Sequence, residues 1–66
     1  MSYQHYDNAG RAFGLNKGRV VHLVRLHGVP KRRIYGQMAV DADAWEVLMS
    51  RLAIPWAPGY GARQAP

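Results

Sequence analysis

The chain has 66 residues and a mass of 7.4 kDa, which is the size of one small domain and excludes a multidomain enzyme. It contains no cysteine, so disulfides and thiolate metal sites are excluded and a reducing compartment is expected. Nine Lys and Arg against four Asp and Glu give a net charge of +5, which favours an anionic partner. Apolar stretches are far shorter than the roughly 20 residues of a membrane helix, and a signal-peptide pattern is lacking, so we expect a soluble, cytoplasmic protein without a membrane partner.

The positive charge is concentrated in one part of the chain. Between Arg11 and Tyr35 there are seven Lys and Arg and no Asp or Glu. The segment from Val40 to Ala53 holds three acidic residues against Arg51 alone. This separation predicts a basic working half joined to a near-neutral supporting half.

The first predicted elements are an arm and a short helix. Residues 1–7 have neither a helical nor a strand period and are predicted to form a flexible arm. Asp7 or Asn8 can cap a helix over residues 9–13 that ends at Gly14.

A second helix is predicted over residues 17–27, with Asn16 as its N-cap and Gly28 after its last residue. One face of this helix is apolar, because its apolar residues recur at i, i+3 and i+4, and the i+7 position is His27. We expect that face to pack in the core, with His27 as a buried, hydrogen-bonded histidine. The residues of this face are Val20, Leu23, Val24 and His27.

A hairpin and a closing helix follow. Two short runs on either side of Gly36-Gln37 predict a β-hairpin, because glycine supplies the positive φ that short turns need. Asp41 is the clearest N-cap in the chain and predicts a helix over residues 42–53, ended by Pro55. The expected core residues of the hairpin and this helix are Ile34, Val40, Trp45, Leu48, Met49 and Leu52.

Residues 54–66 contain three prolines and two glycines, so an extended tail is expected. Trp56 and Tyr60 are unusual in a plain linker. Three interpretations stay open: the two rings fold back over the core, they contact a neighbouring protomer, or they are incidental in a disordered tail. The protomer contact is our working hypothesis.

No pattern of catalytic residues is visible. The three histidines have no cysteine or suitably placed serine beside them, and His22 and His27 lie five positions apart, on different helix faces. The few carboxylates are placed as helix caps, and a glycine-rich phosphate loop is missing. We therefore expect a non-enzymatic protein without a cofactor or a metal site.

The order of these elements resembles the MerR-type winged helix-turn-helix, in the reduced form found in phage and prophage excisionases. The resemblance covers residues 9–53: a helix and turn to Asn16, a helix from Lys17, Val29-Pro30, a basic hairpin, and the helix capped by Asp41. It implies a small α+β fold, mostly helical, with a DNA-binding domain over residues 8–53. The sequence departs from the family at Gly10, where an alanine is usual, and has Gly18 in the first turn of the expected recognition helix.

The resemblance implies sequence-specific binding to double-stranded DNA. The recognition helix enters the major groove and the wing contacts an adjacent groove or phosphates. The residues expected to contact DNA are Asn16, Lys17, Arg19, Val21, His22 and Arg25 on the recognition helix, and Lys31, Arg32, Arg33, Tyr35 and Gln37 on the wing.

The resemblance further implies an architectural role in DNA recombination. Excisionases bind repeated sites cooperatively as an array of copies, bend attachment-site DNA and direct a phage integrase toward excision. In that case the protein acts in the cytoplasm of a bacterial host cell. Two alternatives remain open from the sequence: a small phage or prophage transcription regulator with the same DNA-binding surface, and a basic protein-interaction module.

Overall fold

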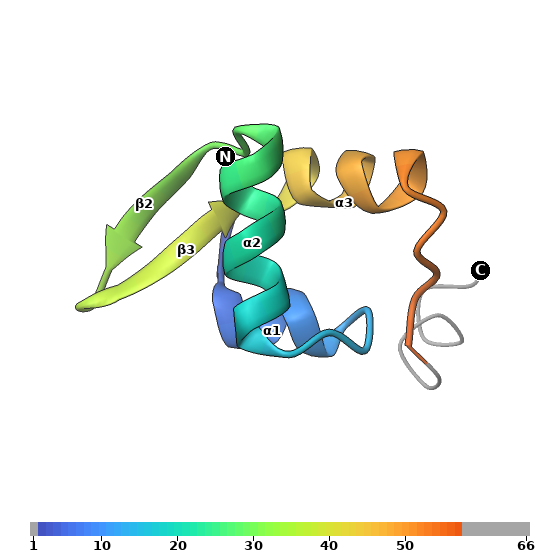
Figure 1. Ribbon diagram of the computed structural model, residues 1–66. Helices are drawn as coiled ribbons and strands as arrows, with labels where there is room; N and C mark the ends of the chain where they lie inside the picture. The colour runs from blue at the N-terminus through green and yellow to red at the C-terminus, as the bar shows by residue number, and fades with distance from the viewer. Residues whose placement is uncertain (1, 58–66) are drawn as a thin grey trace.

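The protein has a small α+β fold, in which strands and helices are interspersed along the chain (Figure 1). The computed structural model describes residues 2–57. In this part of the chain, three helices pack with one three-stranded antiparallel sheet whose strand order is β1-β3-β2. The elements are β1 (Tyr3–His5), α1 (Tyr6–Arg11), α2 (Lys17–His27), β2 (Lys31–Ile34), β3 (Gln37–Asp41) and α3 (Ala42–Arg51).

The first strand corrects the prediction of a flexible arm over residues 1–7. Tyr3–His5 pair with β3 in the register Tyr3↔Asp41 and His5↔Ala39. The imidazole Nε2 of His5 lies 2.9 Å from the carbonyl oxygen of Ile34 at the far edge of the sheet. A three-residue strand has no detectable period, and its pairing partner lies far along the chain, so local sequence carried no signal for it.

Helix α1 also begins earlier than predicted. It covers Tyr6–Arg11, and its N-cap is His5, which makes no side-chain capping bond; Asp7 and Asn8 lie inside the helix. The strand feeds directly into the helix, so β1 pairing sets the start in place of a polar cap. Gly14, with φ 70°, lies in the turn toward α2.

Helix α2 has the predicted bounds. The Asn16 side-chain oxygen accepts a hydrogen bond from the backbone N–H of Arg19 at 2.8 Å, and Gly28 has φ 64° just after the helix. Val20 and Val24 are buried as expected. His27 is exposed, which contradicts its prediction as a core histidine. It is the last residue of the helix, where the chain turns away and leaves that side uncovered.

The hairpin turn lies one residue earlier than predicted. Ile34 pairs with Gln37, so Tyr35 and Gly36 form the two-residue loop, with φ 53° and 76°. Positive φ at both loop residues is the conformation that matches the twist of short hairpins. Glycine is suited to it, whereas tyrosine is not.

Helix α3 is capped as predicted, by the Asp41 carboxylate accepting from the Ala44 N–H at 2.9 Å. Its end is different, because the helix stops at Arg51. Ala53 has φ 56°, and the Ile54 N–H donates to the Met49 carbonyl at 2.9 Å. This is a left-handed helix cap of the Schellman type, so the chain turns before it reaches Pro55.

The core lies where the three helices meet the sheet. Trp45 is fully buried, and its indole N–H donates to the Ala9 carbonyl at 3.1 Å, which ties α3 to α1. Two predicted core residues lie at the margin: Ile34 is half-buried and Leu52 is exposed. The remaining predicted core residues are buried, namely Val20, Leu23, Val24, Val40, Trp45, Leu48 and Met49.

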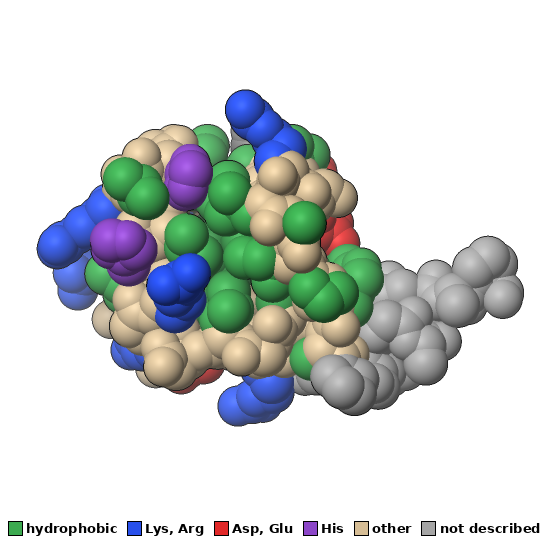
Figure 2. All heavy atoms as spheres, turned by 45° about the vertical axis from the view of Figure 1, so that its right-hand side comes forward, with side chains coloured by type: hydrophobic (Ala, Val, Ile, Leu, Met, Phe, Trp, Pro, Cys, Tyr) green, Lys and Arg blue, Asp and Glu red, His purple; other side chains and the backbone are tan. Residues whose placement is uncertain are grey.

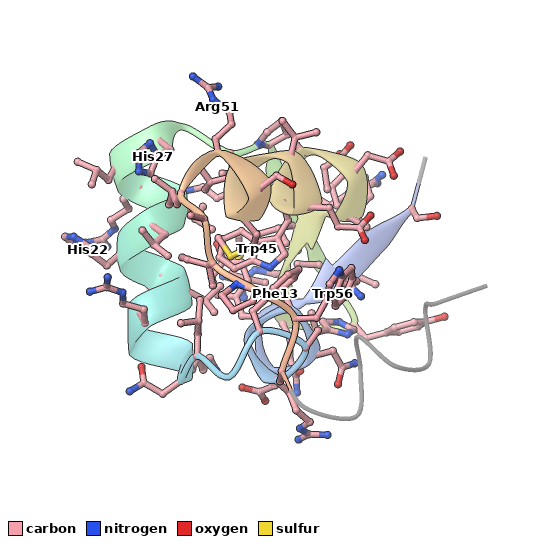
Figure 3. All side chains as sticks on the ribbon, turned by 90° about the vertical axis from the view of Figure 1, so that its right-hand side faces the viewer. Phe13, His22, His27, Trp45, Arg51 and Trp56 are labelled. Atoms are coloured by element: carbon pink, nitrogen blue, oxygen red, sulfur yellow. The ribbon has the colours of Figure 1, made fainter. Side chains whose placement is uncertain are left out.

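The segment after α3 returns to the core, where Trp56 packs on its own chain; the protomer contact at Trp56 stays a prediction. The ring of Trp56 stacks on Phe13 of its own chain, with ring centres 4.4 Å apart and 25° between the planes (Figure 3). The Ala57 N–H donates to the Ala12 carbonyl at 2.7 Å. Phe13 is a buried core residue, and the stack adds the Trp56 ring to its apolar contacts, which favours the return of the chain. Tyr60 lies outside the described residues.

Across residues 2–57, none of the helices has the length and apolar character needed to cross a membrane.

Candidate nucleic-acid interface

Helix α2 has a polar face opposite the core. The helical repeat brings Gly18, His22 and Arg25 onto the side opposite the buried Val20 and Val24. All three are exposed. The centre of this face therefore combines a small residue in the first turn with two side chains that can donate hydrogen bonds.

The two flanks of this face differ. Arg19 is exposed on the side away from the hairpin, whereas Lys17 lies toward the hairpin. Val21 also lies toward the hairpin and is half-buried against the core, so it has little free surface for a base contact. The side-chain oxygen of Asn16 is engaged as the helix cap. The DNA contacts predicted for Asn16 and Val21 stay predictions, with the cap and the core as the other roles of these side chains.

The register of the hairpin divides its basic side chains between two faces. Lys31 pairs with Val40 and Arg33 pairs with Met38, so both basic side chains are on the sheet face that carries Met38. Arg32 is on the opposite face, with its guanidinium carbon 5.3 Å from the centre of the Tyr3 ring. Tyr3 could not be expected as its partner, because β1 was not predicted.

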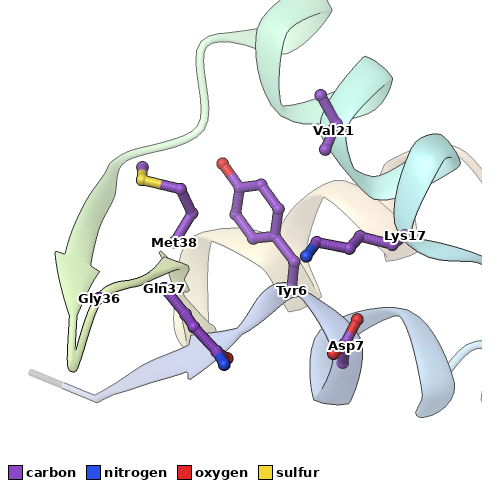
Figure 4. A pocket seen from close by; sticks show the side chains of 7 residues that line it. All are labelled: Tyr6, Asp7, Lys17, Val21, Gly36, Gln37 and Met38. Atoms are coloured by element: carbon purple, nitrogen blue, oxygen red, sulfur yellow. The ribbon is translucent and has the colours of Figure 1, made fainter.

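A hollow of about 250 Å³ separates α2 from the hairpin (Figure 4). Met38 lies on its hairpin side, and Val21 and Lys17 lie on its α2 side. Lys31 and Arg33 share the sheet face of Met38, which lines the hollow together with Lys17, although neither Lys31 nor Arg33 lines it directly. The residues that line the hollow are Tyr6, Asp7, Lys17, Val21, Gly36, Gln37 and Met38.

Tyr6 forms the floor of this hollow. The side chain is only 6% exposed, and its ring belongs to the core cluster. Burial raises the pKa of Tyr6, and the positive charge of Arg25 acts in the opposite direction. The phenol is therefore protonated at neutral pH and can donate a hydrogen bond. Sequence reasoning missed Tyr6 because it fell in the segment predicted to be a flexible arm.

The hairpin tip carries an unusual exposed aromatic. Tyr35 is 96% exposed, and its φ of 53° belongs to a region that non-glycine residues adopt only with strain. Neither packing nor local geometry favours tyrosine at this position. Strained, exposed residues of this kind are concentrated at functional sites.

The structure brings some of the predicted contacts together and places others elsewhere. Lys17, Val21 and Gln37 line the hollow, and the positive charge of Arg25 acts on the Tyr6 phenol at its floor. Lys31 and Arg33 share the sheet face of Met38, and Tyr35 lies in the hairpin loop. The predicted contacts that lie elsewhere or are otherwise engaged are Asn16, Arg19 and Arg32. The remaining predicted contact, His22, is exposed on the polar face of α2.

A different face of the molecule is apolar. Figure 2 shows hydrophobic side chains over the middle of the face where α2 and α3 meet, with basic side chains at its edges. Leu26 and Val47 are exposed there, beside a groove that the sequence did not indicate. The basic concave side and this apolar face are distinct surfaces, because they have no lining residue in common.

The chain was compared with protein-family models, curated proteins and solved structures, and none of them matches it.

Proposed function

We propose that this protein binds double-stranded DNA as a small winged helix-turn-helix domain. In this proposal α2 is the recognition helix and lies in the major groove, while the β2–β3 hairpin is the wing. A helix of 11 residues is about 16 Å long, which suits the roughly 12 Å width of that groove.

The observation that carries the proposal is the shared concave side of α2 and the hairpin. Lys17 on α2 lines the hollow, and the positive charge of Arg25, also on α2, acts on the Tyr6 phenol at its floor. Lys31 and Arg33 on β2 share the sheet face of Met38, which lines the hollow from the hairpin side. Basic side chains gathered on one surface repel one another in the free protein, and binding of a polyanion relieves that repulsion. Duplex DNA also has the alternating ridges and grooves that a helix and a wing fit together.

Within this class we propose the architectural role of an excisionase. One small module gives modest affinity, so several copies on repeated sites would bend attachment-site DNA for an integrase. The support is the resemblance of residues 9–53 and the small size of the domain. A gel assay with a multi-site fragment and circularly permuted probes tests this role: cooperative binding with bending supports it, and independent binding without bending contradicts it.

DNA binding itself is tested by selection from a randomised duplex library, followed by titration of the selected duplex at several salt concentrations. Four phosphate contacts predict a slope of log K against log salt of about −3.6. Arg25→Gln and Arg33→Gln should each lower the affinity and reduce the slope by about 0.9. Arg51→Gln is the matched control, because Arg51 is an exposed arginine on α3.

Two results would contradict the proposal. One is failure of the wild-type protein to enrich any duplex. The other is an equal loss of affinity in all three arginine variants, which would mean that binding depends on net charge and not on the concave side.

A further inference from the structure

Tyr6 is a buried residue whose hydroxyl makes no hydrogen bond within the described residues. Side-chain hydrogen bonds within the described residues involve His5, Asn16, Asp41 and Trp45, and none involves Tyr6. No fully buried side-chain nitrogen or oxygen of residues 2–57 lacks a partner. The Tyr6 hydroxyl therefore keeps contact with solvent, and the hollow that Tyr6 lines provides that contact.

The ring of Tyr6 holds this hydroxyl in one position. The ring stands between Met38 of the hairpin and Val21 of α2, and the hydroxyl is at the end of the ring away from α1 (Figure 4). A ring packed in the core has little rotamer freedom left to lose on binding. The apolar side chains on both sides lower the local dielectric, which strengthens a hydrogen bond made there.

The charges around the hydroxyl favour an anionic acceptor. Lys17 lines the same hollow, and the positive charge of Arg25 acts on the Tyr6 phenol. Asp7 is the one acidic residue among the lining side chains, and it lies at the start of α1. The hollow therefore offers the neutral Tyr6 hydroxyl and the Lys17 ammonium as hydrogen-bond donors. With the charge of Arg25 added, positive charge outweighs the Asp7 carboxylate, which suits an anion with oxygen acceptors.

We propose that this hollow holds one phosphodiester of duplex DNA, with the Tyr6 hydroxyl as hydrogen-bond donor and Lys17 and Arg25 balancing its charge. The inference rests on the proposed function and assigns the backbone contact that fixes the register between recognition helix and wing. Val21 forms with Met38 the apolar walls against which a deoxyribose packs.

The test is Tyr6→Phe, with Tyr3→Phe as the matched control. Tyr3 is a half-buried tyrosine on the sheet face that carries Arg32, away from the hollow. Tyr6→Phe should leave the melting temperature unchanged, because the Tyr6 hydroxyl makes no hydrogen bond within the described residues. It should weaken binding of the selected duplex about tenfold, as expected for a lost hydrogen bond to a charged group. Tyr3→Phe should bind as the wild type does.

The salt dependence separates the hydroxyl from the cations. Tyr6→Phe removes no charge, so its salt slope should equal that of the wild type, whereas Lys17→Gln should reduce the slope by about 0.9. Asp7→Asn removes a negative charge from the hollow and should raise the affinity.

A scan with single methylphosphonate linkages locates the phosphate. At one linkage the difference between wild type and Tyr6→Phe should shrink, and at all others it should stay the same. Failure of the wild type to bind any duplex would overturn the proposed function itself. Wild-type binding with equal affinity of Tyr6→Phe, or a lowered melting temperature of Tyr6→Phe, would overturn only the phosphate site.

Discussion

Replacing Tyr35 by asparagine separates the stability of the hairpin from its proposed contact with DNA. Tyr35 combines a φ of 53° with 96% exposure, so its backbone is strained and the side chain gains no packing energy in return. A non-glycine residue in the left-handed region costs on the order of 1 kcal/mol or more, and asparagine is one of the residues that tolerate it best. We expect Tyr35→Asn to raise the free energy of unfolding by about 0.5–1 kcal/mol, a few degrees in Tm.

The same substitution should weaken DNA binding severalfold, because it removes the aromatic ring at the tip of the wing. Thermal unfolding followed by circular dichroism measures the first effect, and titration of the selected duplex measures the second. Tyr35→Phe is the control, since it keeps both the ring and the backbone strain and should match the wild type in stability. A Tyr35→Asn variant that is no more stable than the wild type would refute the strain argument. A stabilised variant with unchanged affinity would remove Tyr35 from the interface.

Three further predictions concern stability and are measured by urea unfolding, in which a shift of the midpoint with an unchanged m-value reports a change in stability. Gly10→Ala should destabilise the fold by about 1–3 kcal/mol, because the new Cβ would lie 2.5 Å from a backbone oxygen and 2.8 Å from a valine methyl group. Gly18→Ala should stabilise the fold by up to about 1 kcal/mol, because its Cβ would make only an ordinary contact, 3.5 Å from the Asn16 side-chain oxygen. Equal effects of the two substitutions would contradict this reasoning. Ala53→Gly should stabilise by about 0.5–1 kcal/mol through the relief of its positive φ, and no gain would argue against strain there. Trp56→Ala should cost about 1–3 kcal/mol by uncovering Phe13, and an unchanged midpoint would show that the stack contributes nothing.

The Gly18→Ala variant also measures the contribution of Gly18 to DNA binding. Gly18 lies at the centre of the exposed face of α2. If the backbone approaches DNA closely there, as the proposed function expects, Gly18→Ala will lower affinity while it raises stability. An unchanged affinity would mean that this turn does not touch the duplex.

Prediction from the local sequence succeeded where a backbone position requires a particular residue type, such as a helix cap or a left-handed turn. Asn16 and Asp41 cap their helices, and Gly28 takes the left-handed conformation after α2. Each of these depends on neighbours within four positions, so the sequence alone was sufficient. Prediction from the local sequence failed at Ala53, where a residue without the usual preference takes a positive φ because the chain must return over Phe13.

The candidate site also has some features that the sequence determined and others that only the tertiary structure decided. The sequence by itself determined that the bases are concentrated between Arg11 and Tyr35 and that two of the segments carrying them are a helix and a hairpin. The sequence did not determine which of these basic side chains lie on the same face of the domain. That was decided by strand register, which turns Arg32 away from Lys31 and Arg33, and by β1, which leads Tyr6 into the floor of the hollow. Pairing between distant strands depends on the packing of the whole domain, because the period of two that divides the faces becomes meaningful only once the register is set.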